Sequence, residues 1–275
     1  MELTSPKNPW IQQLRQLQQA KGRREQQAFL VEGTHLIQEA LATGWPLQAV
    51  CYTEAWLERH RDLLQQCSSD TRQQPINDAV LKSLTTTETP DGVVGIAARK
   101  FYPALDLGRC HLLLAVETLQ DPGNLGALIR TAAATHTDAL WISPDSVDPD
   151  HPKVLRASAG QWFRLPPRVS DLPQLLQACR EHQIQVLAAV GTPVPEREVR
   201  SFWKQDLTQP TLILLGNEGQ GLSSALIQSA DHLVTIPMAA GVESLNVAIT
   251  GALLLYEARR QQCFYKDCQE NPSCI

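Results

Sequence analysis

Short apolar runs alternate with amphipathic segments along most of the chain, and this alternation predicts an α/β protein. In residues 111–275 the apolar runs are nearly continuous, as in strands that are buried on both faces of a sheet. Strands that alternate with helices indicate a mainly parallel, doubly wound sheet. The predicted strands are 111–116, 139–142, 163–165, 184–190, 212–215 and 233–236, and the predicted helices are 124–134, 151–160, 172–182, 223–229 and 244–261.

Residues 1–98 repeat the alternation on a smaller scale and predict a second α/β domain. A helix is expected over the apolar positions from Ile11 to Leu17, ending at residues 21–24. A strand is expected over 29–31, and a polar loop over 67–75. Proline and glycine mark residues 99–110 as the linker. The expected organisation is therefore a domain over 1–98, a linker over 99–110 and a domain over 111–275.

Composition narrows the class of protein. The chain has 275 residues and a net charge of −5, so its overall charge does not indicate nucleic-acid binding. No apolar run reaches the roughly 18 residues of a membrane span, and the polar start lacks the core of a secretion signal. The seven cysteines are scattered without zinc spacing. We expect reduced thiols, no metal site, no membrane contact and a cytoplasmic location.

The first stretch with candidate chemistry is 121–132, which follows the predicted strand 111–116. Its glycines let a partner approach the backbone, and Asn124 stands where the cap of the next helix is expected. Arg130 interrupts a run of small apolar residues, so it needs a carboxylate or a phosphate as its partner. A structural ion pair and a ligand site are both open at this point. The glycine spacing is not that of a dinucleotide fingerprint.

The second stretch, 214–222, places glycines between an apolar strand and a predicted helix. The carboxyl end of a parallel strand is where doubly wound folds bind ligands. The stretch lacks the lysine of a phosphate-binding loop. Glu218 suits a ribose hydroxyl or a cationic ligand better than a phosphate. A plain glycine-rich turn is the alternative.

The third stretch, 236–247, joins the end of an apolar strand to a long apolar helix through a loop of small residues. Such a loop exposes backbone, and the free N–H groups of the first helical turn can point at a ligand. Glu243, Ser244 and Asn246 gather at the predicted helix start. An ordinary strand-to-helix turn with Ser244 as its cap is the alternative.

In this order and spacing, the three stretches resemble the motifs of the SpoU/TrmH family of RNA ribose methyltransferases, within the SPOUT superfamily. The resemblance covers residues 111–262 and includes the intervening segments 153–160 and 163–166. Two positions depart from the family pattern: Ala240, where glycine is commoner, and Gln161, where alanine is usual. Neither departure touches a residue that the family uses in catalysis.

The resemblance implies transfer of a methyl group from S-adenosylmethionine to a ribose 2′-hydroxyl of RNA, with the cofactor bound in a deep trefoil knot. Positioning is a large part of catalysis in such an in-line displacement. The family arginine is often proposed as the base, but a guanidinium holds its proton, so we expect Arg130 to clamp a phosphate and stabilise oxyanion charge. The implied catalytic residues are Asn124, Arg130, Glu218, Ser244 and Asn246, and the implied cofactor contacts are Leu215, Gly216, Asn217, Gly221, Ile236, Met238 and Leu245.

Near the N-terminus, a second set of positions stands out: Arg23, Arg24, Phe29, 31–33 and 89–93. On these positions, residues 1–98 resemble the substrate-binding domain, related in fold to a ribosomal protein, that some family members carry. Members with this domain often modify large-subunit RNA, so the resemblance implies 23S ribosomal RNA as the substrate and, from the family, a homodimer. A transfer-RNA methyltransferase and a non-catalytic RNA-binding or assembly protein are the alternatives. A basic cluster near the N-terminus is either an RNA contact or a solvated helix face. The expected RNA contacts are Lys21, Arg23, Arg24, Lys153 and Arg156.

Overall fold

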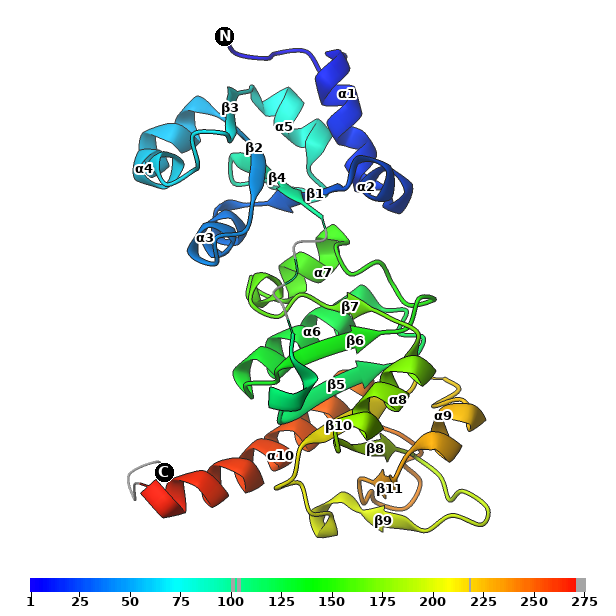
Figure 1. The fold of residues 1–275 in the computed structure, drawn as a ribbon. Coiled ribbons are helices and arrows are strands. Elements are labelled where there is room, and N and C mark those ends of the chain that lie inside the picture. Colours follow the sequence, from blue (N-terminus) through cyan, green and yellow to red (C-terminus); the bar gives the residue numbers. More distant parts are fainter. Residues whose placement is uncertain (100–101, 103–104, 218, 271–275) are drawn as a thin grey trace. The chain divides into compact units, whose positions relative to one another are not determined.

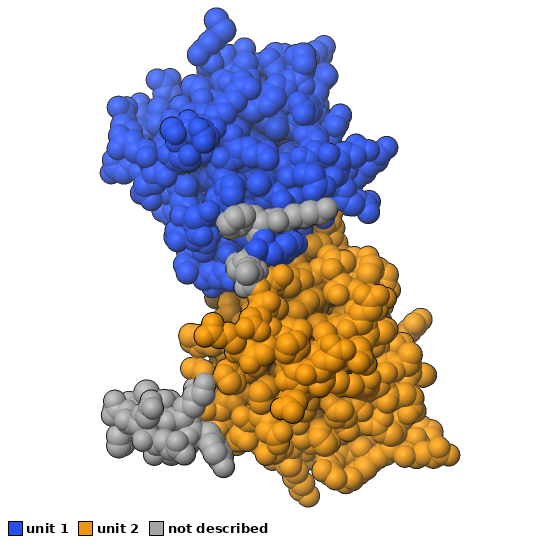
Figure 2. Space-filling model, in the orientation of Figure 1, with its two compact units in different colours: residues 1–103, 150–164 blue, residues 104–149, 165–275 orange. Residues whose placement is uncertain are grey.

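The computed structural model describes residues 1–99, 102, 105–217 and 219–270, with side chains described as far as Gln262. Its internal contacts divide the chain into two compact units (Figure 1, Figure 2). One unit contains residues 1–103 and 150–164, and the other contains 104–149 and 165–275. Both units combine helices with a sheet, so the predicted α/β class is confirmed.

The larger unit is built on a seven-stranded sheet, and all strand pairs identified within the described residues are parallel. The order is β7-β6-β5-β10-β8-β11-β9 (Figure 1). The predicted parallel sheet is confirmed. The trefoil knot concerns the path of the chain rather than the order of the strands, and it stays a prediction. The strands are β5 (Leu112–Val116), β6 (Ala139–Ile142), β7 (Arg168–Val169), β8 (Gln185–Ala189), β9 (Val199–Ser201), β10 (Thr211–Leu215) and β11 (His232–Thr235).

Helices cover both faces of this sheet. Leu212 and Leu214 of β10 share a core with α8 and α9. Leu215 points to the opposite face, because side chains alternate along a strand. There it faces Gly251 of α10, where an added Cβ would lie 3.2 Å from Leu215 and 2.4 Å from Leu128 of α6. The helices and 3₁₀ turns are η2 (Leu107–Arg109), α6 (Pro122–Ala134), α8 (Leu172–Glu181), η4 (Phe202–Lys204), α9 (Ser224–Ser229) and α10 (Val247–Glu270).

The smaller unit has a four-stranded sheet in the order β1-β4-β2-β3, in which only the β2–β3 pair is parallel among the described residues. One face packs on α1 and α5 through a single apolar core. The elements are α1 (Pro9–Arg15), η1 (Gln16–Gln18), α2 (Ala20–Gln26), β1 (Ala28–Glu32), α3 (Thr34–Ala42), β2 (Leu47–Tyr52), α4 (Glu54–Gln65), β3 (Arg72–Pro75), α5 (Asp78–Leu84) and β4 (Val93–Ala98).

Residues 150–164, which the sequence placed with the C-terminal domain, share the core of the smaller unit. They form α7 (Pro152–Ala157) and η3 (Gln161–Phe163). The Trp162 ring lies 5.0 Å from Phe29 and 4.9 Å from Trp45, measured between ring centroids. Asp150 is 2 % exposed and pairs with Arg23 and Arg99 at 3.1 and 2.6 Å. Periodicity within this segment cannot show which sheet it packs against, because apolar side chains suit either core.

Several local expectations were wrong. Residues 163–165 form no strand, and the edge of the sheet is the short β7 instead. Residues 67–75 contain β3, which the sequence hid because its residues are almost all polar. Residues 21–24 lie inside α2 rather than ending a helix, and β9 was not predicted. The last helix begins at Val247, three residues after the predicted start.

Removal of a buried ion pair and removal of an exposed one should change the free energy of unfolding by very different amounts. We expect Asp150→Ala to lower the free energy of unfolding by about 3–5 kcal/mol, because it removes a buried carboxylate that pairs with the fully buried Arg23. The matched control is Glu198→Ala, which removes a 2.7 Å ion pair whose two side chains are 68 % and 50 % exposed. That variant should unfold like the wild type. Urea denaturation followed by circular dichroism measures both, and equal midpoints for the two variants would contradict this prediction.

Candidate functional site

A cavity of about 350 Å³ lies where β8, β10 and β11 end. Parallel strands bring their carboxyl ends to one edge of the sheet, so the loops that follow these strands form one wall. The side chains of Thr250 and Leu254 on α10 contribute another part of the lining. All the residues predicted to contact the cofactor line this cavity, and so does Ser244. Glu243, which the sequence placed at the predicted helix start, also lines it. Lining residues that the sequence did not single out are Ala189, Val190, Gly191, Thr192, Gly219, Gln220, Val234, Thr235, Val247, Thr250 and Leu254.

The loop after β10 depends on the glycine at its start. A Cβ at Gly216 would lie 2.2 Å from the carbonyl carbon of Gly221 and 2.3 Å from the nitrogen of Leu222. Both are backbone atoms that cannot move aside as a flexible side chain can. The loop can therefore fold back on itself only because residue 216 has no side chain.

Asn217 holds the same loop from inside. Its Oδ1 accepts hydrogen bonds from the backbone of Gly219 and Gln220, at 2.7 and 3.2 Å. Its Nδ2 donates to the Thr118 carbonyl at 2.8 Å, which ties the loop to the end of the neighbouring strand β5. Asn217 was predicted as a cofactor contact, and in the structure it also shapes the loop. The predicted catalytic residue Glu218 lies outside the described residues.

Asn124 and Asn246 meet, although they are far apart in the chain. Asn246 Nδ2 donates to Asn124 Oδ1 at 3.0 Å. Asn246 Oδ1 accepts from the N–H groups of Ala248 and Ile249, so Asn246 caps α10 and the expected alternative, Ser244 as the cap, is wrong. The expected cap position of Asn124 is also wrong, because Asp121 caps α6 by accepting from the Asn124 N–H at 2.9 Å. The first and third stretches are thus joined by one side-chain hydrogen bond.

Arg130 is exposed on α6. Within the described part of the chain it makes no hydrogen bond or ion pair, so the structural ion pair considered from the sequence is not formed there. It is absent from the cavity lining. An exposed guanidinium on the helix that begins beside Asn246 is available to an external anion.

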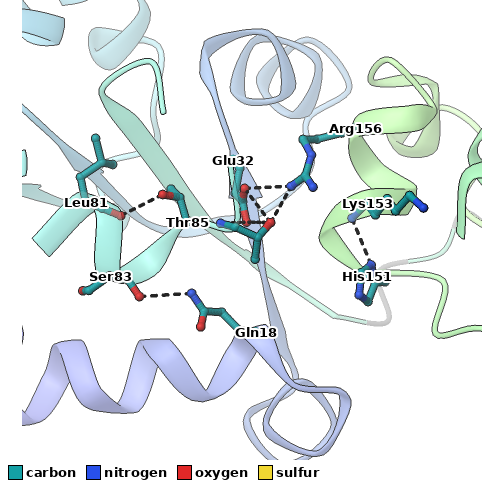
Figure 3. A network of polar contacts seen from close by, with 9 residues as sticks. Gln18, Glu32, Leu81, Ser83, Thr85, His151, Lys153 and Arg156 are labelled. Carbon is teal, nitrogen blue, oxygen red and sulfur yellow. Dashed lines mark hydrogen bonds and ion pairs between the residues drawn. The ribbon is translucent and has the colours of Figure 1, made fainter. Parts of the chain in front are cut away.

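The basic residues expected to contact RNA fall into two groups. Arg23 is 1 % exposed and donates to Asp150 and to two carbonyls of the preceding turn, so its assignment to an RNA surface is corrected to a structural role. Arg156 donates to Glu32 at 2.9 Å (Figure 3). It also donates to the Thr86 hydroxyl at 2.7 Å. The side chains that lie at the surface are Lys21, Arg24 and Lys153.

A polar cluster that the sequence did not flag holds the turn between β5 and α6. Asp145 accepts from the hydroxyls of Ser143 and Thr118, and these hydrogen bonds lower its pKa below the usual aspartate value. Glu117 accepts from the Ser223 N–H at 2.7 Å, across the loop after β10. Serine, threonine and aspartate are ordinary turn residues, so no sequence signal separated this cluster from any other turn.

The described residues contain no helix that is long and apolar enough to cross a membrane. In the same part of the chain, no group of three or more histidine, cysteine, aspartate or glutamate side chains could hold a metal ion.

Comparison with known proteins gives a consistent result for both parts of the chain. The model of the SpoU rRNA Methylase family matches residues 111–256, which is more than half of the chain. The model of the MRM3-like substrate binding domain matches residues 8–95. The two matched ranges do not overlap, so each part of the chain matches a family model of its own.

Similar proteins match over nearly the whole chain. An uncharacterized tRNA/rRNA methyltransferase of Synechocystis is 41% identical, over 94% of each chain. The 23S rRNA guanosine 2′-O-methyltransferase RlmP of Bacillus subtilis is 28% identical, over 94% of this chain and 99% of its own. A crystal structure of an AdoMet-bound rRNA methyltransferase from Sinorhizobium meliloti superimposes with a TM-score of 0.84 at 29% identity, covering 94% of this chain and 97% of that one.

The glycines of the loop after β10 allow a matched test of the cavity. We expect Gly216→Ala to weaken S-adenosylmethionine binding about ten-fold or more, since a loss of about 1.4 kcal/mol is enough for that factor. The cause is the backbone clash at 2.2 Å. In Gly219→Ala the nearest atom outside the neighbouring residues would be the Asn217 side chain at 3.4 Å, so binding should be retained. Isothermal titration calorimetry compares the two, and wild-type affinity in Gly216→Ala would contradict the prediction.

Proposed function

We propose that this chain, which belongs to the SpoU rRNA methylase family, methylates a ribose 2′-hydroxyl of large-subunit ribosomal RNA. The chain is an S-adenosylmethionine-dependent RNA methyltransferase. The observation that carries the proposal is the hydrogen bond between Asn246 and Asn124. It joins the first motif to the third beside Ser244 and Leu245, which line the cavity.

The cavity fits the cofactor in size and in chemistry. A volume of about 350 Å³ lies at the lower end of the range for small-molecule sites, roughly 300–1,000 Å³. Leu215, Ile236, Met238 and Leu245 offer apolar surface for adenine, and the glycine loop exposes backbone groups that can bind its edge. When bound, the cofactor supplies an electrophilic methyl group on a sulfonium centre.

The residues of this chain have the task of placing the RNA hydroxyl and managing its charge. We assign Arg130 to an RNA phosphate and to the oxyanion that develops as the 2′-hydroxyl loses its proton. A guanidinium is a poor proton acceptor, so this role suits its chemistry better than that of a base. Asn124, Ser244 and Asn246 are proposed to position the ribose, with Glu218 as a further family position.

The substrate class rests on the smaller unit and on the relatives. The substrate-binding-domain match spans residues 8–95, and RlmP, which matches over nearly its full length, is named for 23S rRNA. We propose residues 1–98 as the RNA-binding domain, 99–110 as the linker and 111–275 as the methyltransferase domain, with residues 150–164 of the latter segment packing on the smaller unit. Lys21, Arg24 and Lys153 are the surface cations proposed to meet RNA phosphates. We also propose that the chain is located in the cytoplasm.

A homodimer is proposed from an apolar stripe on α10. Ile249, Leu253 and Tyr256 are 53 %, 37 % and 56 % exposed, and their spacing places them on one face of the helix. Exposed apolar groups arranged in a patch mark an interaction surface more often than scattered ones do. A second copy of the chain can cover this stripe.

Methyl transfer to purified RNA tests the function. We expect label from S-adenosylmethionine to enter ribosomal RNA that lacks the modification, and transfer RNA to stay unlabelled. Arg130→Ala should lower the rate about 10²–10³-fold, the usual loss when one stabiliser of oxyanion charge is removed, while cofactor affinity stays unchanged. The control is Arg200→Ala, which removes an exposed arginine of β9.

Other outcomes select the alternatives. Labelled transfer RNA with unlabelled ribosomal RNA would identify a transfer-RNA methyltransferase. Binding of RNA without transfer to any RNA would favour the non-catalytic protein of the same fold. A fully active Arg130→Ala variant would remove Arg130 from the mechanism.

The dimer makes a separate prediction. Leu253→Glu should convert the protein to a monomer, because a charge would be buried without a partner in the interface. Val169→Glu places the same charge on another exposed apolar residue, on β7 at 50 % exposure, and should leave the mass unchanged. Analytical ultracentrifugation at micromolar concentration measures both. A monomeric wild type would contradict the proposal.

A further inference from the structure

Thr118 adopts a backbone conformation that its side chain disfavours. Its φ is +53°, in the left-handed region, at the junction between β5 and α6. Among the described residues it is the only β-branched residue with positive φ. Branching at Cβ makes this region sterically costly, so surrounding contacts must hold the residue there. Strained backbone of this kind concentrates at functional sites.

Each polar group of Thr118 is engaged by a different partner. Its N–H donates to the Ser143 hydroxyl at 2.7 Å, and its own hydroxyl donates to Asp145 at 2.7 Å. Its carbonyl accepts from Asn217 Nδ2 at 2.8 Å. The first two partners follow β6 and the third follows β10, the strands on either side of β5. Thr118 therefore connects the loops after two different strands.

The loop on the far side of this connection is part of the cavity wall. Asn217, Gly219 and Gly221 line the cavity, and Asn217 accepts from the Gly219 N–H while its own N–H donates to the Gly221 carbonyl. The ends of the loop are held separately. The Glu117 N–H donates to the Leu215 carbonyl, and the Glu117 carboxylate accepts from the Ser223 N–H. Between these two ends, the hydrogen bond from Asn217 to the Thr118 carbonyl holds the loop.

We propose that Thr118 is a positioning residue for S-adenosylmethionine: held in a left-handed conformation by Ser143 and Asp145, it directs its carbonyl at Asn217 and so presets Asn217, Gly219 and Gly221 in the cavity wall. The inference rests on the proposed cofactor site. It extends the site to Ser143 and Asp145, which are absent from the cavity lining. A preset loop loses less conformational freedom when the cofactor binds, which raises affinity without a direct contact.

A purely structural role for Thr118 would have a different signature. If its hydrogen bonds only close the turn between β5 and α6, their loss would lower stability and leave cofactor affinity unchanged. Thr135, near the other end of α6, provides the comparison. It is 1 % exposed, and its hydroxyl donates to the carbonyls of Thr131 and Ala132 at 3.0 and 3.1 Å. It does not line the cavity.

The test compares Thr118→Val, Thr118→Ser and Thr135→Val in the full-length protein. Calorimetry with S-adenosylhomocysteine should show a Kd about ten-fold higher in Thr118→Val, the scale expected for one lost hydrogen bond. Its KM for S-adenosylmethionine should rise similarly, while kcat at saturating cofactor is retained. Thr118→Ser keeps the hydroxyl and should restore the wild-type Kd. Thr135→Val should lower the denaturation midpoint without changing Kd.

Two results would overturn the proposal. One is a wild-type Kd in Thr118→Val, and the other is an equal rise of Kd in Thr118→Val and Thr135→Val, which would indicate general loosening. Failure of the wild type itself to bind either ligand would instead refute the cofactor site, and this inference with it. The wild-type titration therefore separates the two failures.

Discussion

The parallel alignment of β8, β10 and β11 is the constraint on which the site depends. Because their carboxyl ends share one edge of the sheet, the loops that follow them meet around one cavity. Each loop is then shaped locally, by the absence of a side chain at Gly216 and by the hydrogen bonds of Asn217. These strands are continuously apolar because helices cover both faces of a parallel sheet and bury the side chains on each face.

Asparagine side chains make the decisive polar connections in this region. An amide both donates and accepts, so one side chain can shape its own loop and hold a neighbour at once. Asn246 caps α10 with its oxygen and reaches Asn124 with its nitrogen, and Asn217 divides its two groups in the same way. Aspartate could replace only the accepting half of either arrangement.

The smaller unit shows how burial redirects charged residues from a surface role to a structural one. Arg23 has the sequence context of an RNA contact, yet it is paired with Asp150 in an interior where an isolated charge would be strongly destabilising. Arg156 is partly exposed, but its partner Glu32 is buried, and the pair fixes Arg156 in the same way (Figure 3). Both partners are more than 120 residues away in the chain, so one pairing ties residues 150–164 to α2 and the other ties them to β1.

The sequence by itself determined the α/β class and the parallel strands, because continuous apolar runs that alternate with amphipathic segments have few other structural solutions. The predicted cofactor contacts that line the cavity came from the resemblance to the SpoU/TrmH family and not from periodicity. It did not determine the polar strand β3, the true caps Asp121 and Asn246, or the structural role of Arg23. Those depend on partners far along the chain or on competition between adjacent polar residues for the same N–H groups. Only the tertiary structure, which brings Thr118, Asp145 and Asn217 together, decided how the cavity loop is held, since such polar turn residues look alike until their neighbours are known.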